Sequence, residues 1–197
     1  MKYAPDRGDP YLYPGTTVLR NRFNIRDPDL LEQVERQLVA EALIRPAPGI
    51  ALTPAGYARL HKHLFGDVYP WAGEMRSVHM SKGNDVFCAP QFRALEMARC
   101  FAAVRADRRL RSRDPERFLE AAAEHVNEIN ARHPFREGNG RTQRLLLEFL
   151  AERAGYHLAI DRIDPQGWNK ASIIGFRDAD HAPMQDVLRV ALVVPTK

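Results

Sequence analysis

Apolar residues recur at intervals of three and four along most of the chain, the spacing of one face of an α-helix. The first two stripes follow Asp27-Pro28 and Thr53-Pro54. A capping side chain followed by a first-turn proline favours a helix start. The cap accepts N–H bonds of the first turn, and the proline ring fixes the backbone in a helical conformation. The pattern predicts helices from residue 28 to about Ile44 and from residue 54 to about residue 65.

Five further helices are predicted by the same reasoning. Asp114-Pro115 and Asp164-Pro165 repeat the capping device, and Gly155 is a typical helix terminator. The expected helices cover residues 90–107, 115–133, 141–154, a short segment from 165, and 181–194. The fold class is therefore all-α in the main.

Residues 74–88 break this spacing and alternate imperfectly, with a turn sequence at Lys82-Gly83-Asn84-Asp85. They predict one small β-hairpin, which is only marginally stable unless it is held by what it covers. Residues 1–26 are rich in Pro, Gly, Tyr and Asp and predict an ordered, irregular arm. Since we find no repeat or linker, residues 27–197 are expected to form a single domain.

Composition narrows the function classes. The chain has 197 residues, a formal charge of +4 and ordinary hydrophobic and charged fractions of 45% and 27%. Its densest arginine cluster, residues 105–113, falls between expected helices, as a solvated connection does, so we expect no direct nucleic-acid binding. Two cysteines form no disulfide framework, and neither a signal sequence nor a membrane-spanning run is present. These features predict a cytoplasmic protein without a membrane partner.

Candidate chemistry is concentrated in residues 133–144. His133 is suited to accept a proton near neutral pH, and Pro134 disfavours continuing a helix beyond it. Gly138 and Gly140 flank Asn139 just before an apolar helix. A glycine-rich turn that opens a helix forms an anion site, because unpaired N–H groups and the positive end of the helix dipole coincide there.

The charged residues of this stretch indicate a polyphosphate. Arg141 and Arg144 are three apart, so they share a helix face and can reach one anion. Glu137 would be repelled by bare phosphates, which predicts a bridging Mg²⁺. The stretch thus combines a general base, a metal-binding carboxylate and a phosphate cradle.

The stretch resembles the signature of the Fic family, His-x-Phe-x-(Asp/Glu)-Gly-Asn-Gly-Arg-x-x-Arg, at every fixed position. The resemblance implies a helical domain that transfers AMP from ATP to a Tyr, Thr or Ser hydroxyl of a target protein. The glycine at 140 distinguishes it from the related Doc toxins, which have lysine there. The implied roles are His133 as the base, Phe135 as the loop's anchor in the core, Glu137 as the magnesium ligand, Gly138, Asn139 and Gly140 as the phosphate cradle, and Arg141 and Arg144 as ligands of the leaving phosphates.

Resemblance also assigns roles outside the loop. The hairpin is similar to the Fic flap, whose edge pairs with an extended segment of the target; the docking residues would be Val78, His79, Met80, Ser81 and Lys82. Lys82 and Gly83 are candidates for nucleotide contact, although a solvated turn lysine fits equally well. Trp168 and Asn169 are candidates for the adenine pocket, or Trp168 is a core residue. His61, His63 and His125 are expected to be structural.

Regulation can also be anticipated from the resemblance. Family members are inhibited by a helix carrying (Ser/Thr)-x-x-x-Glu-(Gly/Asn), and the nearest approach here is Ser112 with Glu116, followed by arginine. This implies a separate small antitoxin, a toxin role, and DNA gyrase or topoisomerase IV as targets. Two alternatives remain, namely transfer of another group such as UMP or phosphocholine, and a non-catalytic basic interaction module.

Overall fold

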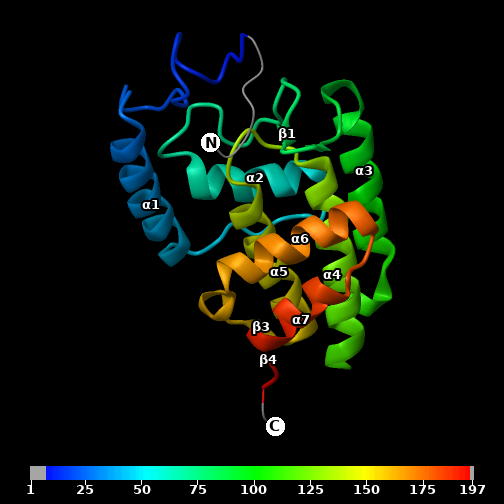
Figure 1. The fold of residues 1–197 in the computed structure, drawn as a ribbon. Coiled ribbons are helices and arrows are strands. Elements are labelled where there is room, and N and C mark those ends of the chain that lie inside the picture. The colour runs from blue at the N-terminus through cyan, green and yellow to red at the C-terminus, as the bar shows by residue number, and fades with distance from the viewer. Residues whose placement is uncertain (1–7, 196–197) are drawn as a thin grey trace. The chain divides into compact units, whose positions relative to one another are not determined.

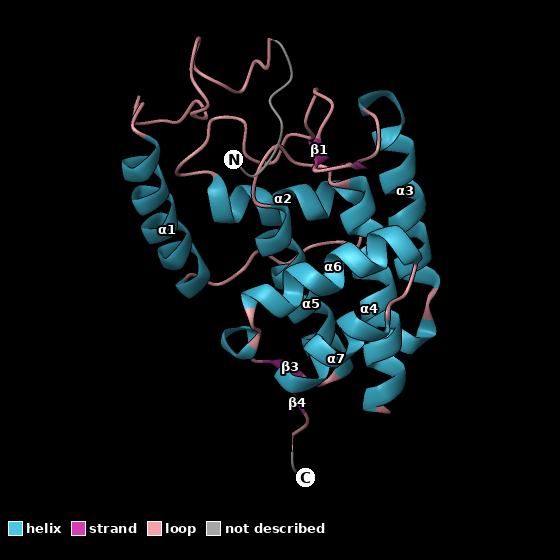
Figure 2. Cartoon of the chain, in the orientation of Figure 1, coloured by secondary structure: helices cyan, strands magenta, loops and turns pink. Residues whose placement is uncertain are grey.

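The computed structural model describes residues 8–195, and most of them are helical (Figure 1; Figure 2). This confirms the expected fold class. The described residues form seven α-helices: α1 Pro28–Ile44, α2 Pro54–Phe65, α3 Pro90–Ala106, α4 Pro115–Arg132, α5 Asn139–Ala154, α6 Pro165–Asp178 and α7 Ala182–Ala191. Two short 3-10 helices, η1 Arg108–Arg111 and η2 Ile160–Arg162, complete the helical elements.

Four helices begin at the capping side chains expected from the sequence. Asp27 accepts N–H bonds at the start of α1, Thr53 at α2, Asp114 at α4 and Asp164 at α6. A proline stands in the first turn of each. Because the cap and the proline act within one turn, these boundaries can be recognised from sequence alone.

The hairpin is present but shorter than residues 74–88. Strand β1, Ser81–Lys82, pairs antiparallel with β2, Asp85–Val86, and the Phe87 N–H donates to the Met80 carbonyl (3.1 Å). Residues 74–80 form no strand. The buried guanidinium of Arg76 donates to the carbonyls of Val78 and, at 2.7 Å, Cys88, so side-chain bonds replace a ladder there.

Two other regions differ from expectation. The last helix ends at Ala191 rather than Val194, and β4, Leu192–Val193, pairs with β3, His157–Leu158. A short apolar run does not distinguish helix from strand by spacing. The arginine-rich segment is more than a solvated connection, because Leu110 of η1 is buried and Arg109 pairs with Asp107 (2.8 Å) and Glu124 (2.6 Å).

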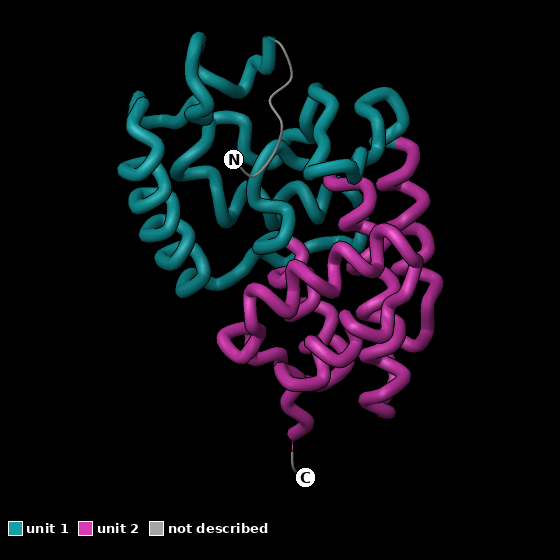
Figure 3. Tube along the Cα trace, viewed as in Figure 1, with its two compact units in different colours: residues 1–94, 134–142 teal, residues 95–133, 143–197 magenta. Residues whose placement is uncertain are grey.

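The chain divides into two compact units (Figure 3). The first comprises residues 1–94 and 134–142, and in it α1 packs against α2. The second comprises residues 95–133 and 143–197, and in it α4 packs against α6 and α7. The single-domain assignment of residues 27–197 stays a prediction.

The N-terminal arm is irregular where it is described. Residues 1–7 lie outside the described part, and from residue 8 onward one bridge links Leu12 with Leu19 while Tyr11 and Tyr13 are buried. Within residues 8–195, no helix has the length and apolar character needed to cross a membrane.

Candidate active site

An aromatic and imidazole platform in the first unit supports residues 134–142. Phe135 is fully buried, and its ring stacks on His61 with the centroids 3.9 Å apart. The Gly73 N–H donates to His61 Nδ1 (2.9 Å), so Nε2 carries the proton and donates to the Glu137 carbonyl (3.0 Å). Burial lowers the pKa of His61 to about 4. His61 is structural, as expected, but its contact with the loop, 76 residues away, has no sequence signal.

Asn139 closes the loop from within. Its Oδ1 accepts the Phe135 N–H (2.9 Å) and its Nδ2 donates to the Phe135 carbonyl (2.8 Å), while the residue is 2% exposed. This two-point clamp occupies the side-chain amide. A role for Asn139 in the phosphate cradle therefore concerns its backbone N–H.

Gly138 occupies a position that only glycine fits. Its φ is +81°, and a Cβ there would lie 2.4 Å from the ring of Phe65. The Thr142 N–H donates to the Gly138 carbonyl (3.0 Å). Consequently the N–H groups of Asn139, Gly140 and Arg141 lie ahead of the first intrahelical bond of α5, where a helix start binds anions.

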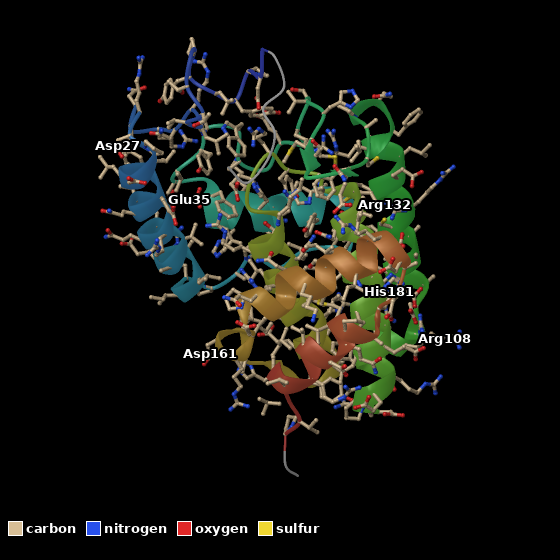
Figure 4. The ribbon with its side chains drawn as sticks, in the orientation of Figure 1. Asp27, Glu35, Arg108, Arg132, Asp161 and His181 are labelled. Atoms are coloured by element: carbon tan, nitrogen blue, oxygen red, sulfur yellow. The ribbon has the colours of Figure 1, made fainter. Side chains whose placement is uncertain are left out.

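Arg141 lies between two carboxylates. Its Nη1 is 2.7 Å from Glu35 Oε1 and its Nη2 is 3.4 Å from Glu137 Oε1, which also accepts the Gly138 N–H (3.0 Å). The guanidinium stacks 4.6 Å over the Phe65 ring. Glu35, labelled on α1 in Figure 4, was not singled out by sequence. The available signal was an acidic residue within the buried stripe of α1.

Glu137 fits a magnesium ion shared with phosphate better than a metal ion bound by protein side chains alone. Within residues 8–195 no group of three or more His, Cys, Asp or Glu side chains is arranged to hold a metal ion. Magnesium commonly binds through one or two carboxylates together with phosphate oxygens and water. Glu137, next to the glycine turn that opens α5, is the residue that would hold it.

His133 and Arg144 belong to the second unit. His133 caps α4 with a φ of +43°, its N–H donates to the Ile129 carbonyl (3.2 Å), and it is 5% exposed. A left-handed backbone at a non-glycine residue is a strained feature that concentrates at functional sites. Arg144 stacks over the ring of Trp168 (5.4 Å), which is buried, while Asn169 is exposed. The adenine-pocket role of these two residues stays a prediction.

The predicted docking residues differ in exposure. Val78 and Met80 are buried, whereas His79, Lys82 and Gly83 are exposed. The backbone of the buried pair is bonded within this segment, because the Val78 carbonyl accepts from Arg76 and the Met80 carbonyl accepts from the Phe87 N–H. Their docking role stays a prediction.

Comparison with known proteins places this loop in a family. The model of the Fic/DOC family matches residues 51–151. The probable protein adenylyltransferase y4lH of Sinorhizobium fredii is 43% identical over 92% of this chain and 94% of its own length. The protein adenylyltransferase VbhT of Bartonella schoenbuchensis is 39% identical over 88% of this chain, but the match covers 37% of VbhT.

Solved structures share the fold. The BepC protein of Bartonella tribocorum, crystallised with bound AMPPNP, superimposes with a TM-score of 0.86 at 24% identity, covering 95% of this chain and 98% of the crystallised chain. The chain belongs to the Fic/DOC family.

Proposed function

We propose that this protein is a protein adenylyltransferase, which transfers AMP from ATP to a hydroxyl group of a target protein and releases pyrophosphate. The observation that carries the proposal is the pairing of Glu137 with Arg141, 3.4 Å apart at the start of α5. Both belong to the complete signature, on a loop fixed by Asn139 and His61. Its relatives y4lH and VbhT are named adenylyltransferases, and BepC binds AMPPNP.

The proposed chemistry assigns each residue a step. His133 takes the proton of the target hydroxyl, whose oxygen attacks the α-phosphorus as the bond to the β-phosphate oxygen breaks. Arg141, Arg144 and the first N–H groups of α5 neutralise the departing pyrophosphate. Magnesium, when held by Glu137, adds positive charge at the same phosphates.

The direct test uses α-labelled ATP, magnesium and bacterial lysate. The parent protein should label a target band, and His133→Ala should abolish labelling because the base is lost. His157→Ala, which replaces an exposed histidine in β3, is the matched control and should retain labelling. Equal labelling by the parent and His133→Ala would contradict the assigned base.

The alternatives are distinguished in the same assay. Transfer of UMP or phosphocholine predicts label from α-labelled UTP or labelled CDP-choline in place of ATP. A non-catalytic basic module predicts no label, with salt-dependent nucleic-acid binding instead.

We also propose that the protein acts in the cytoplasm as a toxin restrained by a separate small antitoxin, with DNA gyrase or topoisomerase IV as the target. The nearest sequence approach to an inhibitory glutamate, Glu116, pairs with Arg189 (2.7 Å) on the second unit's surface. Expression of the parent, but not of His133→Ala, should arrest growth and label a topoisomerase subunit. Growth arrest by both proteins would contradict a toxic role for AMP transfer.

A further inference from the structure

Glu35 makes a contact that the family signature does not include. Its Oε1 binds Arg141 Nη1 (2.7 Å), and its Oε2 accepts the hydroxyl of Tyr69. The family model matches residues 51–151, so α1 and Glu35 lie outside the segment it describes. Glu35, Tyr69 and Arg141 all belong to the first unit.

The position of Glu35 is unusual for a carboxylate. It lies on the buried face of α1 with Leu31, Val39 and Ala42, and only 8% of its surface is exposed. Burying a carboxylate is unfavourable unless it is paired and hydrogen-bonded. An apolar residue would pack there without that cost, which points to a role for the charge.

The partners of Glu35 are themselves held in place. Tyr69 is 1% exposed, its ring stacks on Trp71 (4.5 Å), and burial together with the Glu35 charge raises its pKa, so it remains a donor. Burial lowers the pKa of Arg141, but Glu35 and Glu137 outweigh this effect and raise it overall. The guanidinium is therefore a permanent cation between two carboxylates.

The distances show which carboxylate is the nearer partner of the Arg141 guanidinium. Arg141 is 2.7 Å from Glu35 and 3.4 Å from Glu137. If Glu35 lost its charge, Glu137 would be the remaining carboxylate partner of Arg141 among the contacts seen here. A tighter pair with Glu137 would compete directly with a metal ion for the same oxygen atoms.

We propose that Glu35 is a positioning residue, which anchors Arg141 through Nη1 and thereby limits the pairing of Arg141 Nη2 with Glu137, a pairing that would compete with magnesium at Glu137 and with phosphate at Nη2. This inference rests on the proposed function for its ligands. Tyr69 acts one step further away, by fixing the Glu35 carboxylate.

The test is magnesium-dependent binding of AMPPNP to the full chain, measured by calorimetry. Glu35→Gln should raise the magnesium concentration needed for half-maximal binding about tenfold, as is typical when a partner of a metal ligand is lost. Saturating magnesium should restore binding. Tyr69→Phe should raise the half-maximal magnesium concentration less than Glu35→Gln does. Glu35→Asp, which keeps the charge, should stay close to the parent's value. Glu32→Gln, on the exposed face of α1, is the matched control and should keep the parent's value.

A ligand-free measurement separates this inference from the proposed function. A double-mutant cycle between Glu137 and Arg141, read from urea unfolding, should give a larger coupling in the Glu35→Gln background than in the parent. An unchanged coupling would overturn the inference even if AMPPNP binds. Weaker AMPPNP binding that magnesium does not restore would also overturn it, as a purely structural defect. A parent that binds no AMPPNP with magnesium would refute the proposed function alone.

Discussion

Residues 134–142 and residues 74–88 are the two segments of the first unit with predicted ligand roles, and side chains hold them differently. The loop is bound at several points by buried polar groups: Asn139 clamps Phe135, and His61 binds the Glu137 carbonyl. The hairpin has two-residue strands, and Arg76 binds the carbonyls of both arms.

The contrast is clearest at one glycine in each segment. Gly138 and Gly83 both have positive φ, of +81° and +61°. A Cβ on Gly138 would meet Phe65, whereas nothing lies within 4 Å of a Cβ on Gly83. The loop is therefore closely packed at Gly138, whereas Gly83 at the hairpin tip has open space beside it. If the loop holds phosphate and the hairpin docks a target, this difference would leave the cradle fixed and the docking edge adaptable.

Gly138→Ala should have the largest effect on the loop. Overpacking against Phe65 and a strained left-handed backbone together should cost about 4 kcal/mol of folding free energy. Nucleotide binding should be lost at temperatures where the protein is still folded. Urea unfolding and AMPPNP calorimetry measure the two effects. A variant that keeps the parent's stability would show that Phe65 moves aside readily.

The pH dependence of unfolding should report the buried His61. Its pKa is about 4 in the folded state against 6.5 for an ordinary histidine, so the unfolded chain takes up the proton first as pH falls. The contribution of neutral His61 to the free energy of unfolding is fully present above pH 6.5. As the pH falls to about 4, this contribution is lost progressively, by about 3 kcal/mol. Urea unfolding between pH 7 and pH 4 measures this loss.

A matched pair of variants isolates that histidine from other titrating groups. His61→Gln should flatten the pH dependence, while His63→Gln, on the same helix and half-buried, should preserve it. Parallel curves for the parent and His61→Gln would contradict the assignment of the buried neutral imidazole.

Arg76→Lys should loosen the hairpin and leave the loop in place. Lysine keeps the charge but cannot bind two carbonyls in a fork, so the cost should be about 2 kcal/mol. Hydrogen exchange of the Phe87 amide, which bonds to Met80, should accelerate, while that of Thr142 should not. Equal acceleration at both amides would mean that Arg76 supports the whole unit.

The helical fold and the loop were predictable because their causes are local. Asp27-Pro28 and Asp164-Pro165 each fix a helix start within one turn, and the signature places its chemistry in twelve consecutive residues. Likewise, Pro134 after His133 correctly indicated the end of α4 at Arg132.

The rest depends on contacts between distant residues, which hydrophobic spacing does not encode. The bond from His61 to Glu137 spans 76 residues, and the Glu35 contact with Arg141 joins α1 to α5. The observed hairpin is shorter than expected, because the guanidinium of Arg76 binds carbonyls that a strand ladder would otherwise use. The pairing of β3 with β4 was missed because each strand has only two residues, too few for a recognisable alternation, and the two strands are distant in sequence.

Gly83→Ala should have the smallest effect, although its backbone resembles that of Gly138. Open space around the new methyl group leaves only the left-handed conformation as a cost, about 1 kcal/mol. AMPPNP binding should be unchanged if Gly83 contributes no essential nucleotide contact, while labelling of a protein target should fall if the hairpin turn must keep its shape for docking. Comparing calorimetry with target labelling therefore sharpens the contrast between the two segments. If Gly83→Ala weakened AMPPNP binding as strongly as Gly138→Ala, the hairpin tip would share the loop's role in holding the nucleotide.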